Sequence, residues 1–494
     1  MSQFLLILKS NDLIHASLFL MIFLDVYLGR FGTISTRLDV YFVPCFLVAL
    51  NYLIYNFKQG ISRLIFFCFI MIYFAVNYFS IMNGYYFEKF YSPYQNYIYE
   101  FLNPGAYNDR EWDVEYYFSN KEFFAVKILI NASNLYVGGG VQVAVSVLEE
   151  LSDSAFDFIA VVSPVVYSQL SKNASLNCIV IKSTPSKLLN FKVRKQLDEI
   201  VIENDISVVF TIFGPSYWSP KNIKHAIGFA LPWLIYDTSH IFKKLGIKAR
   251  LKSSILRFLQ PYYFKKNADL IFTETDDVNQ RVTKLLSFDK GKVYTVSNTL
   301  NGLFTSSKGY DYSILDKLPE KKINDIWLVT ISHNYPHKNL EVISELVKIL
   351  PSHYKFVLTV SSDFLQLIPK EYRDQVITIG NITINQCAPL YEASDGLFMP
   401  TLLECFSASY LEAMYMKKII FTSDLPFAHT VCKDAAFYFC PYDVKNIRDT
   451  LINGFLNKEA LAHKVSMGST IYEQFPSAKA RALQYMDIIK SNLL

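Results

Sequence analysis

Residues 404–414 read Glu-Cys-Phe-Ser-Ala-Ser-Tyr-Leu-Glu-Ala-Met, with glutamates at Glu404 and Glu412. An apolar stretch at 396–399 precedes this segment and ends at Pro400. The pattern predicts a buried strand, a short polar turn that holds Glu404, and a helix that carries Glu412. Ligands of open α/β sheets bind at the carboxyl ends of the strands. We therefore expect both carboxylates to lie beside a ligand that is rich in hydroxyl groups.

The spacing of the two glutamates resembles the donor-site motif of retaining glycosyltransferase family 4. That family has the GT-B fold, in which two Rossmann-like domains face a cleft. The resemblance implies that Glu404 contacts the transferred sugar and that Glu412 holds the ribose of the nucleotide. It also implies that backbone amides near Phe406 and Ser407 face the sugar or the phosphates. The alternative is a helix with two solvated glutamates, since pairs of glutamates are common on helices.

A second candidate, Lys338, follows the apolar strand predicted at 325–331. We predict that Lys338 opens an amphipathic helix, where an ammonium group and helix-start amides would suit a diphosphate. The family carries a lysine here, usually with an arginine five residues earlier, and this chain has His333 at that position. We expect Lys338 and Glu404 to be catalytic and His333 to contact the substrate. The alternative is an ordinary helix start with a surface lysine.

The third candidate is a glycine loop, Gly138 to Gly140, which follows a strand predicted at 126–131. Glycine lets the backbone approach a phosphate without interference from a Cβ atom. Gly139 and Gly140 are therefore expected to bind substrate. In a GT-B enzyme the glycine loop of the first domain closes over a donor held by the second domain. The alternative is a flexible turn.

One stretch departs from the family. Many members place a histidine at the end of a first-domain strand, whereas residues 228–233 read Gly-Phe-Ala-Leu-Pro-Trp. His225 and His240 flank this stretch and are expected to be ordinary core or surface histidines. The resemblance implies that the donor's own phosphate takes the acceptor proton, so that no side-chain nucleophile is required.

Composition argues against other classes of function. A net charge of +4 over 494 residues, without a basic block, argues against nucleic-acid binding. The seven cysteines form no Cys-x-x-Cys pair, which favours a reducing compartment over a disulfide framework. Residues 125–494 contain neither zinc-ligand spacing nor an Asp-x-Asp motif. We therefore predict a metal-independent enzyme with no cofactor, whose nucleotide-sugar is a substrate.

The first 88 residues differ from the remainder of the chain. Apolar runs at 13–28, 38–57 and 64–82 are of membrane-spanning length, and basic residues lie between them. They predict two or three transmembrane helices, with a buried helical hairpin as the alternative. Because nucleotide-sugars are made in the cytoplasm, we expect anchoring in the bacterial inner membrane with the catalytic part in the cytoplasm.

The apolar runs carry a second resemblance, to the tail of O-antigen and exopolysaccharide polymerases. It rests on Arg-Phe-Gly at 30–32, Arg-Leu-Asp-Val-Tyr-Phe at 37–42 and Tyr-Ser-Pro-Tyr at 91–94. A remnant of a polymerase, a fusion, and a coincidence among apolar helices all stay open.

A chain of this length is too long for one core and should hold several domains. The expected function is retaining, hexosyltransferase-type transfer from a nucleotide-sugar to a lipid-linked glycan in surface polysaccharide biosynthesis. A catalytically silent GT-B scaffold and another GT-B activity, such as nucleotide-sugar epimerisation, are the alternatives. The expected domains are transmembrane helices at 1–88, a linker at 89–124, an N-terminal Rossmann-like domain at 125–300, an interdomain linker at 301–324, a nucleotide-sugar-binding Rossmann-like domain at 325–475 and a C-terminal helix at 476–494.

Overall fold

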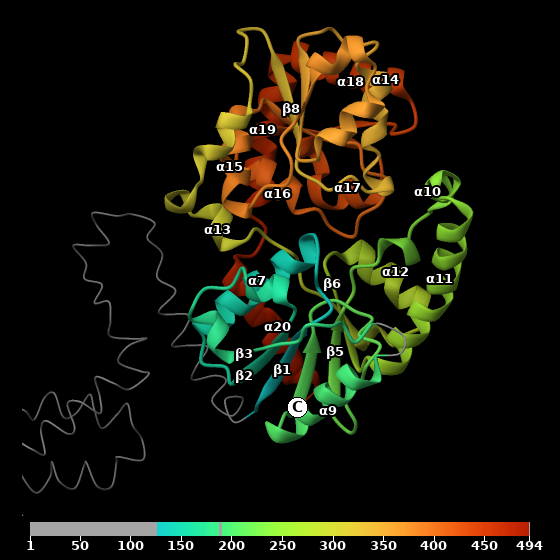
Figure 1. Cartoon of the computed structure of the whole chain (residues 1–494), viewed down its shortest axis with the longest axis vertical. Coiled ribbons are helices and arrows are strands. Elements are labelled where there is room, and N and C mark those ends of the chain that lie inside the picture. Colours follow the sequence, from blue (N-terminus) through green and yellow to red (C-terminus); the bar gives the residue numbers. More distant parts are fainter. Residues whose placement is uncertain (1–125, 187–189, 494) are drawn as a thin grey trace, which may run out of the picture. The chain divides into compact units, whose positions relative to one another are not determined.

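The computed structural model describes residues 126–186 and 190–493, all within one compact unit of the chain, Asn120–Leu494 (Figure 1). The predicted membrane spans, the linker that follows them and the polymerase-like segments lie outside the described residues and stay predictions. Among the helices of the described part, none combines the length and the apolar character needed to cross a membrane.

The first domain is built on a parallel seven-stranded sheet in the order β3-β2-β1-β4-β5-β6-β7. Its strands are short and largely apolar, as is typical of parallel strands covered on both faces. Strands β2 and β3 follow β1 on one side of it, whereas β4 to β7 follow on the other side. The topological switch point therefore lies between β1 and β4. The strands are β1 (Ile128–Ala132), β2 (Phe158–Val162), β3 (Cys178–Val180), β4 (Val208–Thr211), β5 (Lys224–Gly228), β6 (Leu270–Thr273) and β7 (Val293–Thr295).

Helices connect the strands of this sheet. Helix α7 follows the glycine loop and buries Val141, Val145, Leu148 and Leu151, which share one helical face. The helices are α7 (Gly139–Ser152), α8 (Pro164–Tyr167), α9 (Phe191–Glu203), α10 (Ser239–Lys244), α11 (Ile247–Asn267) and α12 (Asp276–Leu286).

The second domain repeats this design on a parallel six-stranded sheet in the order β10-β9-β8-β11-β12-β13. Its switch point lies between β8 and β11. The predicted strands at 325–331 and 396–399 are confirmed as β8 and β11, and the α/β class with two Rossmann-like domains is confirmed. The strands are β8 (Ile326–Thr330), β9 (Tyr354–Leu358), β10 (Val376–Thr378), β11 (Gly396–Met399), β12 (Ile419–Ser423) and β13 (Ala436–Phe439).

Separate apolar clusters pack on the second sheet. One contains Leu397 and Tyr410 and the other contains Leu328 and Phe398. Because neighbouring residues of a strand point to opposite faces, Leu397 and Phe398 place these clusters on the two sides of the sheet. The helices are α14 (Ile343–Leu346), α15 (Ile384–Ala393), α16 (Ala408–Tyr415), α17 (Pro426–Cys432), α18 (Val444–Leu456) and α19 (Lys458–Tyr472).

The segment between the two sheets is ordered rather than an extended linker. It contains α13 (Gly302–Thr305) and the 3-10 helix η7 (Tyr312–Lys317). Phe304 and Ile314 are buried in the core of the second domain. Two apolar anchors within a polar stretch thus attach this segment to the second domain.

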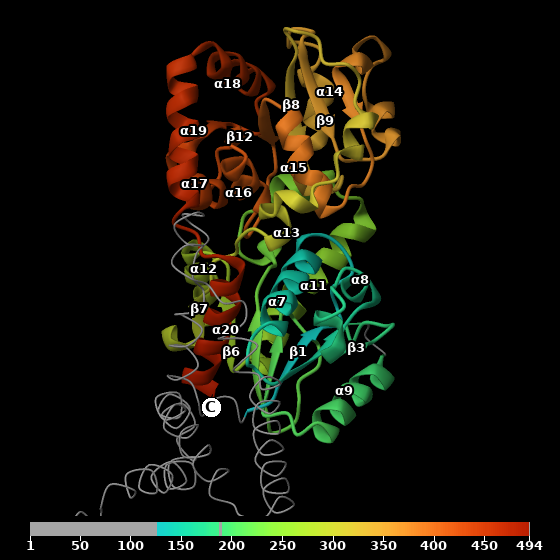
Figure 2. The same cartoon turned by 90° about the vertical axis from the view of Figure 1, so that its left-hand side faces the viewer.

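The chain then returns to the first domain through α20 (Ala478–Leu493), which runs beside α7 (Figure 2). Tyr485 of α20 packs against Phe272 and Phe210, with ring centroids 4.8 and 5.0 Å apart. Aromatic pairs at this separation add to the energy of apolar burial. The C-terminal helix is therefore part of the first-domain core.

Candidate active site

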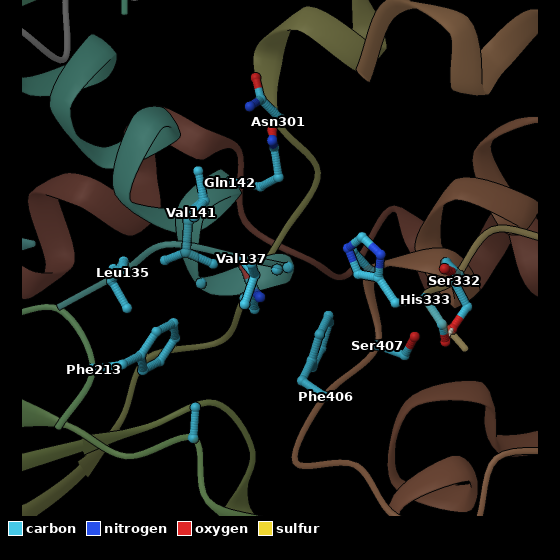
Figure 3. A pocket seen from close by; sticks show the side chains of 18 of the residues that line it. Leu135, Val137, Val141, Gln142, Phe213, Asn301, Ser332, His333, Phe406 and Ser407 are labelled. Atoms are coloured by element: carbon cyan, nitrogen blue, oxygen red, sulfur yellow. Dashed lines mark hydrogen bonds between the residues drawn. The ribbon is translucent and has the colours of Figure 1, made fainter. Parts of the chain in front are cut away.

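A cavity of about 750 Å³ lies between the two domains, where the carboxyl ends of both sheets meet. Residues after β1 and β4 line it from the first domain, and residues after β8 and β11 line it from the second. Both switch points therefore open into one cavity. Figure 3 shows Val137 and Gln142 on the first-domain side and His333 and Phe406 on the second-domain side. All of the predicted site residues line it: Gly139, Gly140, His333, Lys338, Glu404, Phe406, Ser407 and Glu412.

Lys338 and Glu404 form an ion pair at the second switch point. Their side chains are only 16% and 13% exposed. The hydroxyl of Thr401 donates a hydrogen bond of 3.0 Å to the carboxylate oxygen of Glu404 that Lys338 contacts. A lysine ammonium has three donors, so Lys338 can serve Glu404 and a ligand oxygen together. The pair holds one cation and one acceptor at the same point of the cavity.

The local structure predicted around Lys338 is wrong. Lys338 is the last residue of a 3-10 helix, η8 (Pro336–Lys338), and Asn339 follows in the left-handed conformation with φ 55°. Asparagine tolerates this conformation better than most residues. Its amide group donates to the carbonyl of Pro441 over 3.2 Å and accepts from Lys244 over 2.7 Å. The helix that follows begins only after Asn339, as the 3-10 helix η9 (Leu340–Val342) and then α14, so no α-helix start lies at Lys338.

His337 connects the two loops that carry the pair. Its carbonyl accepts hydrogen bonds from the amide of Leu402, over 2.7 Å, and from the hydroxyl of Thr401, over 3.2 Å. Burial lowers the pKa of the imidazole to about 4, so this side chain is neutral at pH 7. The backbone of His337 thus holds the loop after β11 against the loop after β8.

Glu412 lies one turn into α16 and is 7% exposed. The hydroxyl of Tyr391 donates to it over 3.0 Å. Burial raises the pKa of Glu412 to about 7. Together with the low exposure of Glu404, this burial rules out a pair of solvated glutamates. A buried carboxyl group beside a cavity is placed to accept hydrogen bonds from ligand hydroxyls.

This pKa predicts a pH-dependent nucleotide affinity. The carboxylate fraction of Glu412 rises between pH 6 and 8, and an ionised acceptor makes the stronger hydrogen bond. With Glu412 at the ribose, as the family resemblance implies, we expect affinity for the nucleotide to rise across this range, and Glu412→Gln to lose about tenfold in affinity at pH 8 together with the pH dependence. Titration calorimetry at several pH values measures both. Because titration of the nucleotide itself affects every variant, Glu459→Gln, at an exposed position of α19, is the control and should behave as the parent. An unchanged Glu412→Gln would remove this residue from the site.

The three glycines of the first-domain loop differ in backbone conformation and in the space available for a Cβ atom. Gly138 has φ 72° and caps α7, so its backbone favours glycine. A Cβ atom on Gly139 would meet nothing within 4 Å, whereas one on Gly140 would lie 3.3 Å from Leu135. Gly139 and Gly140 are the first residues of α7, whose start has no side-chain cap. Their amides are therefore available to an anion in the cavity.

The remaining predicted residues surround the start of α16. Ser407 is the N-cap residue, and its side chain makes no capping hydrogen bond. Phe406 is half-buried, with its ring centroid 6.1 Å from that of Phe475. His333 is exposed at the cavity, and its ring centroid lies 5.6 Å from that of Tyr335. The helix-start amides that we expected at Lys338 are supplied here by α16 instead.

A buried polar cluster at the cavity was not predicted from the sequence. Arg481 of α20 is 1% exposed and donates to Asn298 over 2.5 Å and to Ser146 over 2.8 Å. The amide group of Asn298 donates to Glu274 over 2.8 Å. Burial raises the pKa of Glu274 to about 8, and the charge of Arg481 opposes that rise. The sequence signal for Glu274 is its position directly after β6, at the carboxyl end of a strand.

The two histidines near the unusual stretch lie outside the cavity lining. His225 is fully buried, with Nε2 2.7 Å from the hydroxyl of Thr211, and burial lowers its pKa to about 3. His240 is exposed and stacks on Tyr442 at 3.9 Å. The loop at 230–232 lines the cavity without a histidine. His225 is thus a core histidine and His240 a surface histidine.

The second domain is similar in sequence to known glycosyltransferases. Residues 315–469 match the family model Glycosyl transferases group 1. The O-antigen chain mannosyltransferase RfbU of Salmonella typhimurium is 22% identical over 209 residues, which are 40% of this chain and 56% of that protein. The chain thus spans little more than half the length of this relative. The matched family segment contains Lys338, Glu404 and Glu412.

Solved structures are similar over both domains. A glycosyltransferase from Rickettsia africae has a TM-score of 0.57 at 17% identity, covering 74% of this chain and 98% of that one. Anabaena HepE in complex with UDP-glucose has a TM-score of 0.56 at 13% identity, covering 74% and 99%. The described chain has the GT-B fold. Its cavity lies in the cleft that this fold places between two Rossmann-like domains.

Proposed function

We propose that this protein is a retaining glycosyltransferase that moves a sugar from a nucleotide-sugar donor to a lipid-linked glycan in surface polysaccharide biosynthesis. The observation that carries the proposal is the Lys338–Glu404 pair at the second switch point, with buried Glu412 beside the same cavity. The names of the relatives support it, since RfbU is an O-antigen mannosyltransferase and HepE was solved with UDP-glucose.

Each residue has a role that its position supports. Glu412 accepts hydrogen bonds from the ribose hydroxyls, and Glu404 accepts them from the sugar. Lys338 and the amides at the start of α16 stabilise the charge that develops on the diphosphate. Gly139 and Gly140 close over the phosphates from the first domain. His333 contacts the donor where the family usually has an arginine.

The reaction needs no nucleophile from the protein. The anomeric carbon–oxygen bond of the donor breaks, and its electron pair goes to the diphosphate. The acceptor hydroxyl oxygen forms the new bond on the same face of the sugar, and its proton passes to a diphosphate oxygen. The cavity of about 750 Å³ lies within the usual range of ligand sites, roughly 300–1,000 Å³.

Binding and turnover test the proposal together. The full-length chain is titrated by calorimetry against UDP, GDP, ADP and CMP, and the preferred sugar donor is then assayed for hydrolysis and for transfer to a lipid-linked acceptor. We expect one nucleotide to bind and its sugar donor to be consumed. If no nucleotide binds to the folded chain, the transferase proposal fails.

A catalytically silent scaffold is the second candidate. His333 in place of arginine and a cavity loop at 230–232 without histidine favour it. Nucleotide binding without hydrolysis or transfer of any sugar donor would decide for the scaffold.

The proposal further assigns residues 1–88 to anchoring in the inner membrane, with the described domains in the cytoplasm.

The reaction is expected to proceed without a divalent metal ion. Among the described residues, no group of three or more His, Cys, Asp or Glu side chains is arranged to hold a metal ion. Lys338 and helix-start amides would stabilise the diphosphate instead. We predict that turnover in EDTA stays within about twofold of the untreated rate. Complete loss in EDTA with rescue by Mn²⁺ would contradict this prediction, and calcium-saturated EDTA is the control for non-specific effects.

A further inference from the structure

Helix α11 lies at the outer side of the first domain (Figure 1), presents an apolar stripe to solvent and contributes no residue to the cavity lining. The spacings along the stripe are four, four, three and four residues, which place its members on one side of a helix. The stripe consists of Ile247, Leu251, Ile255, Phe258 and Tyr262, which are 84, 64, 51, 80 and 55% exposed.

The opposite side of α11 holds the helix to the domain. Phe264 is fully buried, and its ring centroid lies 5.1 Å from that of Phe229. Asn267 is also buried. At 100° per residue both point away from the stripe. The stripe is thus the outer face of a helix that is already packed, and its apolar side chains contribute little to the described core.

The charge around the stripe has one sign. Residues 239–267 contain eight lysines and arginines and no aspartate or glutamate, a formal charge of +8. The whole chain carries +4, so all other residues together carry 4 − 8 = −4. Six of these cations lie in α11 and two in α10, and they are interleaved with apolar residues in the sequence, so they do not form a basic block there.

The basic side chains lie on both flanks of the stripe. At 100° per residue, Lys248 and Lys252 lie on one flank, and Arg250 and Arg257 lie on the other. The arginines are held in place by the two residues that flank α10: Arg250 donates to the carbonyl of Leu245 over 2.7 Å, and Arg257 donates to the hydroxyl of Thr238 over 2.7 Å. The two lysines are exposed. The exposed surface of α11 therefore consists of an apolar stripe with basic side chains on both sides.

We propose that α11 docks in the plane of an anionic lipid bilayer, with the stripe at the boundary between headgroups and acyl chains. Helices of this pattern lie in membrane interfaces, and basic residues beside them bind anionic lipids. A nucleic acid would pair with the lysines and arginines but would leave five large apolar side chains in water. The docking surface of α11 lies outside the cavity lining. The docking proposal therefore requires neither residues 1–88 nor transferase activity.

Photocrosslinking in bilayers tests the docking. The full-length chain is reconstituted in vesicles of phosphatidylglycerol and phosphatidylcholine, with benzoylphenylalanine in place of Phe258. The matched control carries it in place of Leu456, an apolar residue of α18 that is 74% exposed. We expect at least about tenfold more lipid adduct from position 258 than from position 456.

Charge reversal tests the basic flank. Combining Lys248→Glu with Lys252→Glu should lower the adduct yield at position 258 more than about fivefold, as should vesicles of phosphatidylcholine alone. Thermal unfolding midpoints should match the parent, because all substituted side chains are exposed. Equal yields at positions 258 and 456 would overturn the proposal. A crosslink from position 258 to residues 1–125, to a second copy of the chain or to nucleic acid in place of lipid would also overturn it.

Discussion

Replacing Lys338 with alanine is expected to lower the turnover number about 100- to 1,000-fold, the usual cost of removing one group that stabilises transition-state charge. Lys338 is paired with Glu404 at the switch point of the second sheet, where the leaving diphosphate would lie. Negative charge on the diphosphate grows as the bond to the sugar breaks, so the ammonium is needed more in the transition state than in the ground state. Nucleoside monophosphate affinity should change much less than turnover.

Two controls separate this role from a structural one. Lys348→Ala removes an exposed lysine that pairs with Glu345 and should leave turnover unchanged. Lys338→Ala also leaves Glu404 without its cation, and Glu404 itself is assigned to the sugar, so Glu404→Gln alone and the double variant complete a cycle that measures the coupling of the two side chains. Kinetics and titration with the monophosphate and the diphosphate of the preferred nucleoside provide the measurements. Equal weakening of both nucleotides with unchanged turnover would place Lys338 away from the diphosphate.

Replacing Arg481 with methionine is expected to destabilise the protein by about 3–5 kcal/mol, the range for breaking a buried charged network from one side. Arg481 is 1% exposed and connects α20 to Ser146 of α7 and to Asn298 after β7. Without it, Asn298 and Glu274 stay buried with one of their partners lost. We expect α20 to separate from the first domain at a lower temperature than in the parent.

The thermal unfolding midpoint measures this loss, and Lys458→Met, at an exposed position of α19, is the control for replacing a cation with methionine. Above pH 8, where Glu274 is ionised in the parent, Arg481→Met with Glu274→Gln should recover part of the midpoint, because the second change removes the buried acid whose charge Arg481 offsets. If Arg481→Met has the same unfolding midpoint as the control and the parent, the buried polar cluster contributes no stability. Additive effects of the two substitutions would instead show that Arg481 and Glu274 are not coupled.

Local patterns were enough to predict much of the second domain. Apolar runs before Lys338 and Glu404 correspond to β8 and β11, and the helix with Glu412 corresponds to α16. The same holds in the first domain for β1 and for the buried face of α7. Strand alternation, helical periodicity and turn residues act over a few positions, so they can be recognised in one stretch of sequence.

The helix predicted at Lys338 shows where local patterns fail. Residues 338–350 have helical periodicity, yet the chain turns through Asn339 and forms an α-helix only at Ile343–Leu346. The contacts that hold Asn339 come from Lys244 and Pro441, 95 and 102 residues away along the chain. No window around Lys338 contains them.

The sequence by itself determined the α/β class, the strands at the centre of each sheet, the loop that carries Glu404, and the helices α7 and α16 that carry Gly139 and Glu412. Only the tertiary structure decided which of these groups meet. Lys338 and Glu404 are 66 residues apart in the chain, and Arg481 and Ser146 are 335 residues apart. The outer stripe of α11 likewise depends on which side of the helix packs on the domain. Pairing and exposure depend on where whole elements pack in space, and that packing is set by burial of apolar surface across both domains rather than by neighbours in sequence.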